Sequence, residues 1–307
     1  MTLVGRRVRL WPKRGGNLGI HGSNKVMKIG ITMYSFHRTF KEGKMDIERF
    51  IEHCGKEGFD SLDLVSYFWK DRAKEEAQIK GWMKKTKVKL LTYAVGNNML
   101  PDDPKQLEAE MEKVRDGIRA AAKLGAPYVR VFGGSNIAGF TSASALDHVI
   151  AKFKGLMPMC KDHGVTLAIE NHGGWPGTAA EQRMVVEGVD DEHFTGLFDT
   201  GNWIRTDEDA VKAAKELKGI VGLVHVKDMC RLPANTKDPA AMFEERSKHK
   251  VKPAAMGEGD VHIPEVLQAL KASGFDGYAT IEAEWPGDEF VNASSALAYM
   301  RKTTGSL

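Results

Sequence analysis

Four acidic or imidazole side chains stand inside apolar stretches of this 307-residue sequence, where an unpaired charge is costly. They are Glu170 in LAIEN, Asp199 in GLFDT, His225 in GLVHV and Glu282 in ATIEAE. One such residue is usually a polar group that finds a partner within the core. Four of them, each in a strand-like run and following one another along the chain, indicate that they share a partner.

A divalent metal ion is the simplest shared partner. Three carboxylates and one imidazole leave positions open for water or substrate, and they suit Mn²⁺, Mg²⁺ or Co²⁺ better than a thiolate-rich structural Zn²⁺ site does. We expect one divalent ion, with Mn²⁺ favoured and Mg²⁺, Co²⁺ or Zn²⁺ as alternatives. The competing interpretation is an ion-pair network in which Lys227, Arg130 or Arg231 neutralises the acids.

From Lys28 onward, short β-branched and aromatic runs alternate with longer segments of helical period. The expected strands cover residues 28–36, 61–65, 89–95, 128–134, 166–171, 196–200, 220–226 and 278–284. Helices such as 45–58, 104–125, 145–164 and 263–274 each end in a glycine, as helices with a left-handed C-terminal cap do. Strands that are apolar on both faces are typical of a parallel sheet covered by helices. The sequence therefore predicts an α/β fold, a single (β/α)₈ TIM barrel.

An open doubly wound sheet is the alternative, but the dinucleotide-binding pattern GxGxxG is absent after the first strand. In a barrel, the carboxyl ends of all strands meet at the face that carries the active site. Residues 229–257 follow the seventh strand there, and they are polar and too long for an ordinary barrel loop. We interpret them as an insertion that covers the site, with a peripheral decoration as the alternative.

The charge distribution narrows the classes of partner. The net charge of +3 is misleading, because residues 1–27 contain six Arg or Lys and no acid, whereas residues 28–307 contain 38 basic and 41 acidic residues. We therefore expect no nucleic-acid partner. No apolar run approaches the roughly 18 residues of a membrane span, so we expect no membrane association either.

Residues 1–27 lack the apolar core of a secretory signal. We interpret them as a disordered basic extension or a wrongly assigned upstream start, and place the barrel in residues 28–307. Cys54, Cys160 and Cys230 are distant from one another and form no CxxC pair. This pattern favours reduced thiols and a cytoplasmic location.

Five short motifs resemble a known family. They are LAIENH at 167–172, FDTGN at 198–202, VHVKD at 224–228, GEGDV at 257–261 and TIEAEW at 280–285. They are similar to motifs of the sugar phosphate isomerase/epimerase family of xylose-isomerase-like barrels, especially its D-tagatose/D-psicose 3-epimerases, and the resemblance extends over about residues 28–303. It implies that Glu170, Asp199, His225 and Glu282 bind one divalent metal ion.

The resemblance also implies a reaction. A metal ion that polarises a carbonyl allows a carboxylate to deprotonate the adjacent carbon. Two carboxylates on opposite sides of the substrate can remove a proton from one face and return it on the other, and the family assigns this role to Glu170 and Glu282. We expect a divalent-metal-dependent sugar isomerase or epimerase that acts on a small-molecule sugar.

Two further residues are substrate-binding candidates by their position. His172 lies two residues beyond Glu170 and projects from the same strand face. Glu258 lies in a glycine-flanked turn where the backbone approaches the expected pocket. Lys227 is a third candidate, with a pairing to Asp228 behind the metal ligands as the alternative.

The family pattern adds two substrate-binding candidates. Arg231 takes the place of a substrate-binding arginine of the epimerases, and Asn202 stands where they usually have histidine. Pro176 replaces another substrate-binding residue, a glutamate. These departures affect the substrate pocket and leave the identity of the sugar open, while the four metal ligands are unchanged.

Other functions compete with the isomerase. The same deprotonation followed by loss of a leaving group gives a dehydratase or lyase that acts on an inosose or a keto-glycoside. Remote alternatives are an endonuclease IV-like phosphodiesterase, which needs a histidine-rich zinc cluster, and a non-catalytic sugar-binding module. The sequence leaves open whether copies associate into a homo-oligomer.

Overall fold

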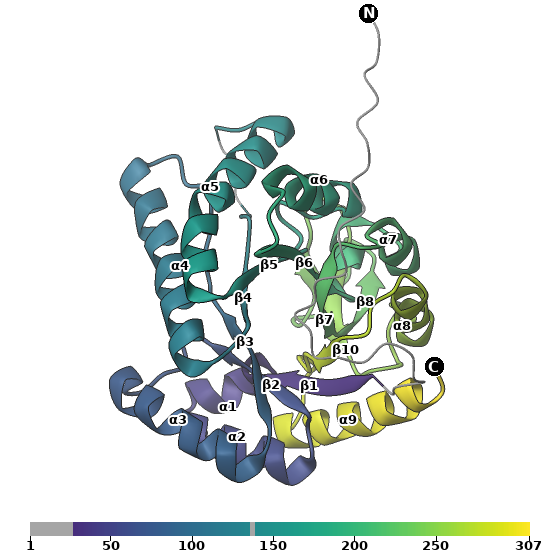
Figure 1. Cartoon of the computed structure of the whole chain (residues 1–307). Helices are drawn as coiled ribbons and strands as arrows, with labels where there is room; N and C mark the ends of the chain where they lie inside the picture. Colours follow the sequence, from purple (N-terminus) through teal and green to yellow (C-terminus); the bar gives the residue numbers. More distant parts are fainter. Residues whose placement is uncertain (1–26, 136–138) are drawn as a thin grey trace, which may run out of the picture.

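In the computed structural model, which describes residues 27–135 and 139–307, eight parallel strands close into a barrel with helices around it (Figure 1). The strands are β1 Lys28–Thr32, β2 Ser61–Val65, β3 Lys89–Ala94, β4 Tyr128–Val131, β5 Thr166–Glu170, β6 Phe194–Asp199, β7 Val221–Val226 and β11 Tyr278–Ile281. Their neighbour order, β1–β11–β7–β6–β5–β4–β3–β2, has no open edge. The predicted (β/α)₈ barrel is therefore confirmed, and the open sheet is wrong.

Helices cover the outside of the barrel. They are α1 His37–Lys41, α2 Ile47–Glu57, α3 Arg72–Thr86, α4 Pro104–Leu124, α5 Ser142–His163, α6 Ala179–Val189, α7 Ala210–Glu216, α8 Ile263–Ala272 and α9 Glu289–Gly305. The predicted glycine ends are present at Gly58, Gly125 and Gly164, which cap α2, α4 and α5 with a left-handed backbone. The helix α8 differs, because Ser273 is its cap and the left-handed Gly274 follows.

Three strands end three or four residues earlier than the sequence predicts. The first ends at Thr32, whose hydroxyl accepts a hydrogen bond from the N–H of Tyr34 and starts the 3₁₀ turn η1, Met33–Phe36. The run predicted at 128–134 leaves the barrel after Val131, because the side chain of Asn97 pairs with the backbone of Phe132. The run predicted at 278–284 ends at Ile281. In each case the residues beyond the strand build the loops over the carboxyl-terminal face.

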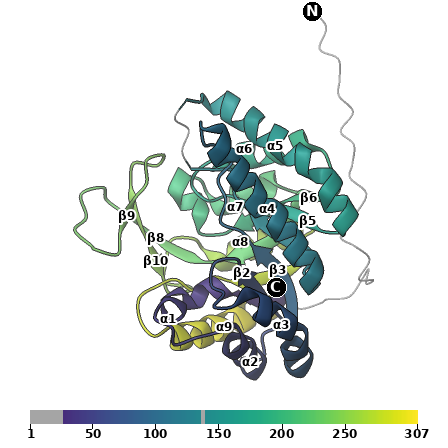
Figure 2. The same cartoon turned by 90° about the vertical axis from the view of Figure 1, so that its left-hand side faces the viewer.

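Residues 229–257 contain nearly all of a small antiparallel sheet that projects from the barrel, together with the loops that join its strands (Figure 2). It consists of β8 Asp228–Leu232, β9 Met242–Phe243 and β10 Lys250–Ala254, in the order β8–β10–β9. Three ion pairs attach this segment to α6 and to the 3₁₀ turn η2, Asn202–Thr206, with the residue that follows it. They are Arg246 with Glu181, Glu244 with Arg205, and Arg231 with Asp207.

The main hydrophobic core lies between the strands and the helices, and Met27, the first described residue, is part of it. Of the segment 1–27 that we interpret as a disordered extension or a wrongly assigned start, residues 1–26 lie outside the described part of the chain. All three cysteines are free, two of them buried. Within the described ranges, no helix combines the length and apolar character needed to cross a membrane.

Candidate functional site

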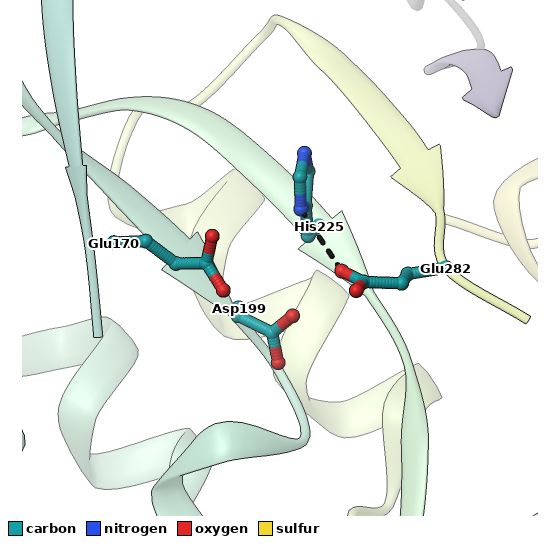
Figure 3. A group of neighbouring side chains, drawn as sticks. All are labelled: Glu170, Asp199, His225 and Glu282. Atoms are coloured by element: carbon teal, nitrogen blue, oxygen red, sulfur yellow. Dashed lines mark hydrogen bonds and ion pairs between the residues drawn. The ribbon is translucent and has the colours of Figure 1, made fainter. Parts of the chain in front are cut away.

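The carboxyl ends of four neighbouring strands bring Glu170, Asp199, His225 and Glu282 together (Figure 3). Glu170 and Asp199 are the last residues of β5 and β6, His225 lies next to the end of β7, and Glu282 directly follows β11. One ligand atom from each lies within 4.8 Å of those of the others, and all four residues are buried. Glu170 and Glu282 enter from opposite sides, with Asp199 and His225 between them (Figure 3).

The strand register explains this convergence. Asp199 pairs with His225 in the β6–β7 ladder, and Thr280 pairs with His225 in the β11–β7 ladder. Glu282 lies two residues beyond Thr280 and therefore on the same face of the chain. Its N–H donates to the carbonyl of Val226 at 2.9 Å, which continues the ladder past the end of β11.

Both ring nitrogens of His225 face carboxylates. Nδ1 lies 3.2 Å from Glu282 Oε2, and Nε2 lies 3.0 Å from Asp63 Oδ2 at the other side of the ring. Burial lowers the pKa of His225, but the hydrogen bonds to Asp63 and Glu282 outweigh burial and raise this pKa to about 10.

Two further cations lie among the acids. Lys227 Nζ is 3.4 Å from Asp199 Oδ2, 3.5 Å from Glu284 Oε2 and 3.8 Å from Glu282 Oε1. Arg130 Nε lies 3.4 Å from Glu170 Oε2. The ion-pair network that we considered from the sequence is thus present for Lys227 and Arg130, whereas Arg231 pairs with Asp207 instead.

The donor set nevertheless fits a divalent cation. Five carboxylates surround the site, from Asp63, Glu170, Asp199, Glu282 and Glu284. Among the described residues, Lys227 and Arg130 are the only lysine or arginine side chains paired with them. Asp199 Oδ2 is buried without a hydrogen-bond partner among the described residues. Burial raises the pKa of Asp199 to about 7 even though Lys227 opposes this shift. An additional positive charge would satisfy the orphan oxygen and the excess of buried acids.

The predicted substrate-binding residues divide into two groups. Asn202 and Lys227 contact the cluster, and Asn202 Nδ2 donates to Glu170 Oε1 at 3.1 Å. His172 lies beside the cluster and lines a cavity. Arg231 and the exposed Glu258 make no described contact with the four residues, so their role in substrate binding stays a prediction.

Sequence reasoning missed two acids of the site. Asp63 stands in the apolar run SLDLV, which is the same signal that identified the other four residues. Glu284 follows Glu282 by two residues and so shares its face of the chain. Alternation in the motif TIEAEW was therefore enough to find Glu284.

A cavity of about 370 Å³ adjoins the cluster at Glu170. The loops after β3, β4 and β5 form most of its lining, including Phe132, His172 and Trp175. Trp203 is fully buried, so only Trp175 of the tryptophans after β5 and β6 reaches this space. The site therefore combines a charged cluster with an adjoining, partly aromatic chamber.

Residues 51–303 match the family described as xylose isomerase-like TIM barrel. The chain belongs to this family. The match includes all four residues of the cluster.

The chain is also similar to curated relatives and solved structures whose names include an inosose dehydratase and a sugar epimerase. An inosose dehydratase of Mesomycoplasma hyopneumoniae (strain J) is 27% identical over 147 residues, which are 46% of this chain and 49% of the relative. The chain thus spans about half the length of this curated relative. The IolI protein with a bound zinc atom superposes with a TM-score of 0.77 at 14% identity, covering 91% of this chain and 99% of that one. D-psicose 3-epimerase gives a TM-score of 0.68 at 17% identity, covering 91% and 100%. At these identities the structural likeness shows the fold.

Proposed function

We propose that this protein is a divalent-metal-dependent isomerase or epimerase that acts on a keto sugar. The observation that supports this proposal is the buried cluster of Glu170, Asp199, His225 and Glu282, whose donor atoms lie within 4.8 Å of one another at the catalytic face of the barrel. A small-molecule sugar as substrate, a preference for Mn²⁺ and a cytoplasmic location belong to the same proposal. The IolI structure, which shares the fold of this chain, contains a bound zinc atom.

The two glutamates have the positions that proton transfer at carbon requires. A divalent ion held by the four residues would polarise the substrate carbonyl and make the neighbouring C–H acidic. Glu170 and Glu282 approach from opposite sides of the space between them (Figure 3), so one can take the proton and the other can return one.

Cationic and amide side chains of the site orient Glu170 and Glu282. Arg130 and Asn202 each contact one oxygen of Glu170, and His225 and Lys227 contact Glu282. Burial raises the pKa of Glu282, but Lys227 and His225 outweigh burial and hold this pKa below its usual range. Glu282 is therefore ionised in the free protein and is the residue that we assign as the base.

A dehydratase acting on an inosose is the second candidate, and the matches to inosose dehydratases support it. It shares the first deprotonation and differs in the second step. An epimerase returns a solvent hydrogen to the same carbon, whereas a dehydratase expels the neighbouring hydroxyl. Product analysis separates the two.

The test is an incubation of the full chain in D₂O with Mn²⁺ or with EDTA, against ketoses, inososes and 3-keto-glycosides. Metal-dependent deuterium uptake with an epimeric or isomeric product is the expected result, read by NMR. Loss of water or of an aglycone would move the assignment to a lyase. Absence of exchange with every compound, in protein that binds the metal tightly, would refute the proposed function.

A further inference from the structure

The cavity of about 370 Å³ beside the cluster, which we call the chamber, adjoins the cluster at a single residue. Of the four cluster residues only Glu170 lines it, and helix α4 adds Glu110 and Lys113 on another side. Its volume of about 370 Å³ lies within the range of small-molecule sites, roughly 300–1,000 Å³. Because Glu170 lies at its edge, a substrate that reacts between Glu170 and Glu282 can extend into this space.

We propose that the chamber binds a second, uncharged ring linked to the reacting sugar, so that the substrate is a keto-glycoside rather than a free monosaccharide. This inference rests on the proposed function, because a group in the chamber belongs to the substrate only if the reaction takes place at Glu170. Two kinds of group could supply this ring, an aryl group and a second sugar.

The charges of the lining argue for an uncharged ligand group. Lys113 Nζ is 2.6 Å from Glu110 Oε1, and the other oxygen of Glu110 accepts the N–H of Asn98 at 3.0 Å. A phosphate in the chamber would meet no described cation that is free of a carboxylate.

The walls of the chamber combine aromatic rings with one polar ring, that of His172. The rings of Phe132 and His172 lie with their centroids 4.5 Å apart, and Trp175 lies nearby with the guanidinium of Arg246 over its ring at 4.3 Å. His172 is exposed to the chamber, and no described residue hydrogen-bonds to its ring. Rings that supply apolar area, with one or two polar groups that fix orientation, are the usual lining of a small-molecule site.

Hydrogen bonds between loops hold the walls in place. The side chain of Asn97 pairs with both backbone groups of Phe132, and the N–H of Trp175 donates to the carbonyl of Gly134 at 2.7 Å. At Gly133 a Cβ atom would lie 1.9 Å from the carbonyl oxygen of Trp175, so only glycine permits this approach of the two loops. The chamber is therefore pre-formed, which lowers the entropic cost of binding.

The experiment compares three keto-glycosides in the Mn²⁺-loaded full chain: phenyl 3-keto-β-D-glucoside, 3-ketocellobiose and methyl 3-keto-β-D-glucoside. D-Psicose and D-fructose 6-phosphate complete the panel. Deuterium exchange in D₂O gives kcat/KM for each. We expect at least one ring-bearing compound to exceed the methyl glycoside tenfold, and the phenyl and disaccharide arms tell which kind of ring is preferred.

Filling the chamber provides the matched test. Ser135 is exposed and lines the chamber, so Ser135→Trp should lower kcat/KM about tenfold more for the ring-bearing compound than for the methyl glycoside. Ser142→Trp, at an exposed serine outside the lining, is the control. Ser135→Phe is the smaller replacement if the tryptophan variant does not fold, and circular dichroism and Mn²⁺ affinity report on folding.

The outcomes separate this inference from the proposed function. Three results would overturn the inference and leave the metal-dependent proton transfer intact. They are equal kcat/KM for ring-bearing and methyl compounds, an equal loss of kcat/KM for both compounds in Ser135→Trp, and a preference for the free ketose or its phosphate. Absence of exchange with every compound would refute the proposed function. Saturation-transfer NMR from the protein to the phenyl protons would then test binding of the ring in the chamber independently of turnover. This transfer should be present in the wild type and absent in Ser135→Trp.

Discussion

The carboxylate of Asp63 lies 3.0 Å from Nε2 of His225, although 162 residues separate them in the chain. Asp63 comes from β2 and His225 from β7, and both side chains are almost fully buried. This contact leaves Nδ1 of the ring turned toward Glu282 and the rest of the cluster. Histidines that bind metals commonly donate their other ring N–H to a carboxylate, which fixes the ring and its tautomer.

Replacing Asp63 tests this relationship directly. Asp63→Asn should weaken Mn²⁺ binding by about 10- to 100-fold, because the ring loses the carboxylate that orients it. Isothermal titration with Mn²⁺ measures the effect in the apo protein. Asp276→Asn, at an exposed position before β11, serves as the control and should bind as the wild type does. Unchanged affinity in Asp63→Asn would contradict a positioning role, whereas absence of binding in the wild type would refute the metal centre itself.

Removing the acid–base function of Glu282 should abolish turnover without unfolding the protein. We expect Glu282→Gln to slow deuterium exchange by about 10²- to 10⁴-fold, the contribution typical of a positioned general base. The exposed Glu265 of α8 offers a control, Glu265→Gln, with exchange at the wild-type rate. Circular dichroism establishes that both variants are folded. Exchange at the wild-type rate in Glu282→Gln would remove Glu282 from the mechanism.

Lys227 lies among Asp199, Glu282 and Glu284, and its loss should be costly in the absence of metal. Lys227→Met leaves buried carboxylates without their cation, so we expect the free energy of unfolding in EDTA to fall by about 3–5 kcal/mol. Mn²⁺ should stabilise this variant more than the wild type, since the ion supplies the missing positive charge. Urea denaturation with and without Mn²⁺ measures both quantities.

The control for this prediction is Lys252→Met. Lys252 pairs with Asp238 in the projecting sheet at 3.0 Å, and both side chains are partly exposed. A pair of this kind contributes about 0–1 kcal/mol. If Lys227→Met were as mild as Lys252→Met, the acids around Lys227 would have to be protonated in the folded protein.

A histidine outside the site should affect the pH dependence of stability. His53 lies edge-on against the rings of Phe36 and Phe290, and burial lowers the pKa of its imidazole below 6.5. Below pH 6.5 the unfolded chain takes up a proton at His53 that the folded protein does not, so this residue reduces stability as the pH falls through that window. Between pH 7 and pH 5, His53→Gln should therefore lose less stability in urea denaturation than the wild type. Equal losses in both proteins would contradict this assignment.

Local patterning in the sequence determined the architecture and the positions of the four cluster residues along it. Apolar strand runs, helices of regular period and left-handed glycines such as Gly58 and Gly125 are local signals, and a closed barrel is the arrangement that buries such strands on both faces. Because parallel strands end at one face, the polar residues at the carboxyl ends of β5, β6, β7 and β11 had to converge there.

Tertiary structure alone decided the contacts between distant strands and loops. The pairing of Asp63 with His225 depends on closure of the barrel, which brings β2 within reach of β7 across its interior. The chamber depends on hydrogen bonds among the loops after β3, β4 and β5, and no local pattern specifies which loops meet. Arg231 lies in β8, where it pairs with Asp207. The path of the projecting sheet determines the position of this side chain, and the spacing between Arg231 and His225 in the sequence does not.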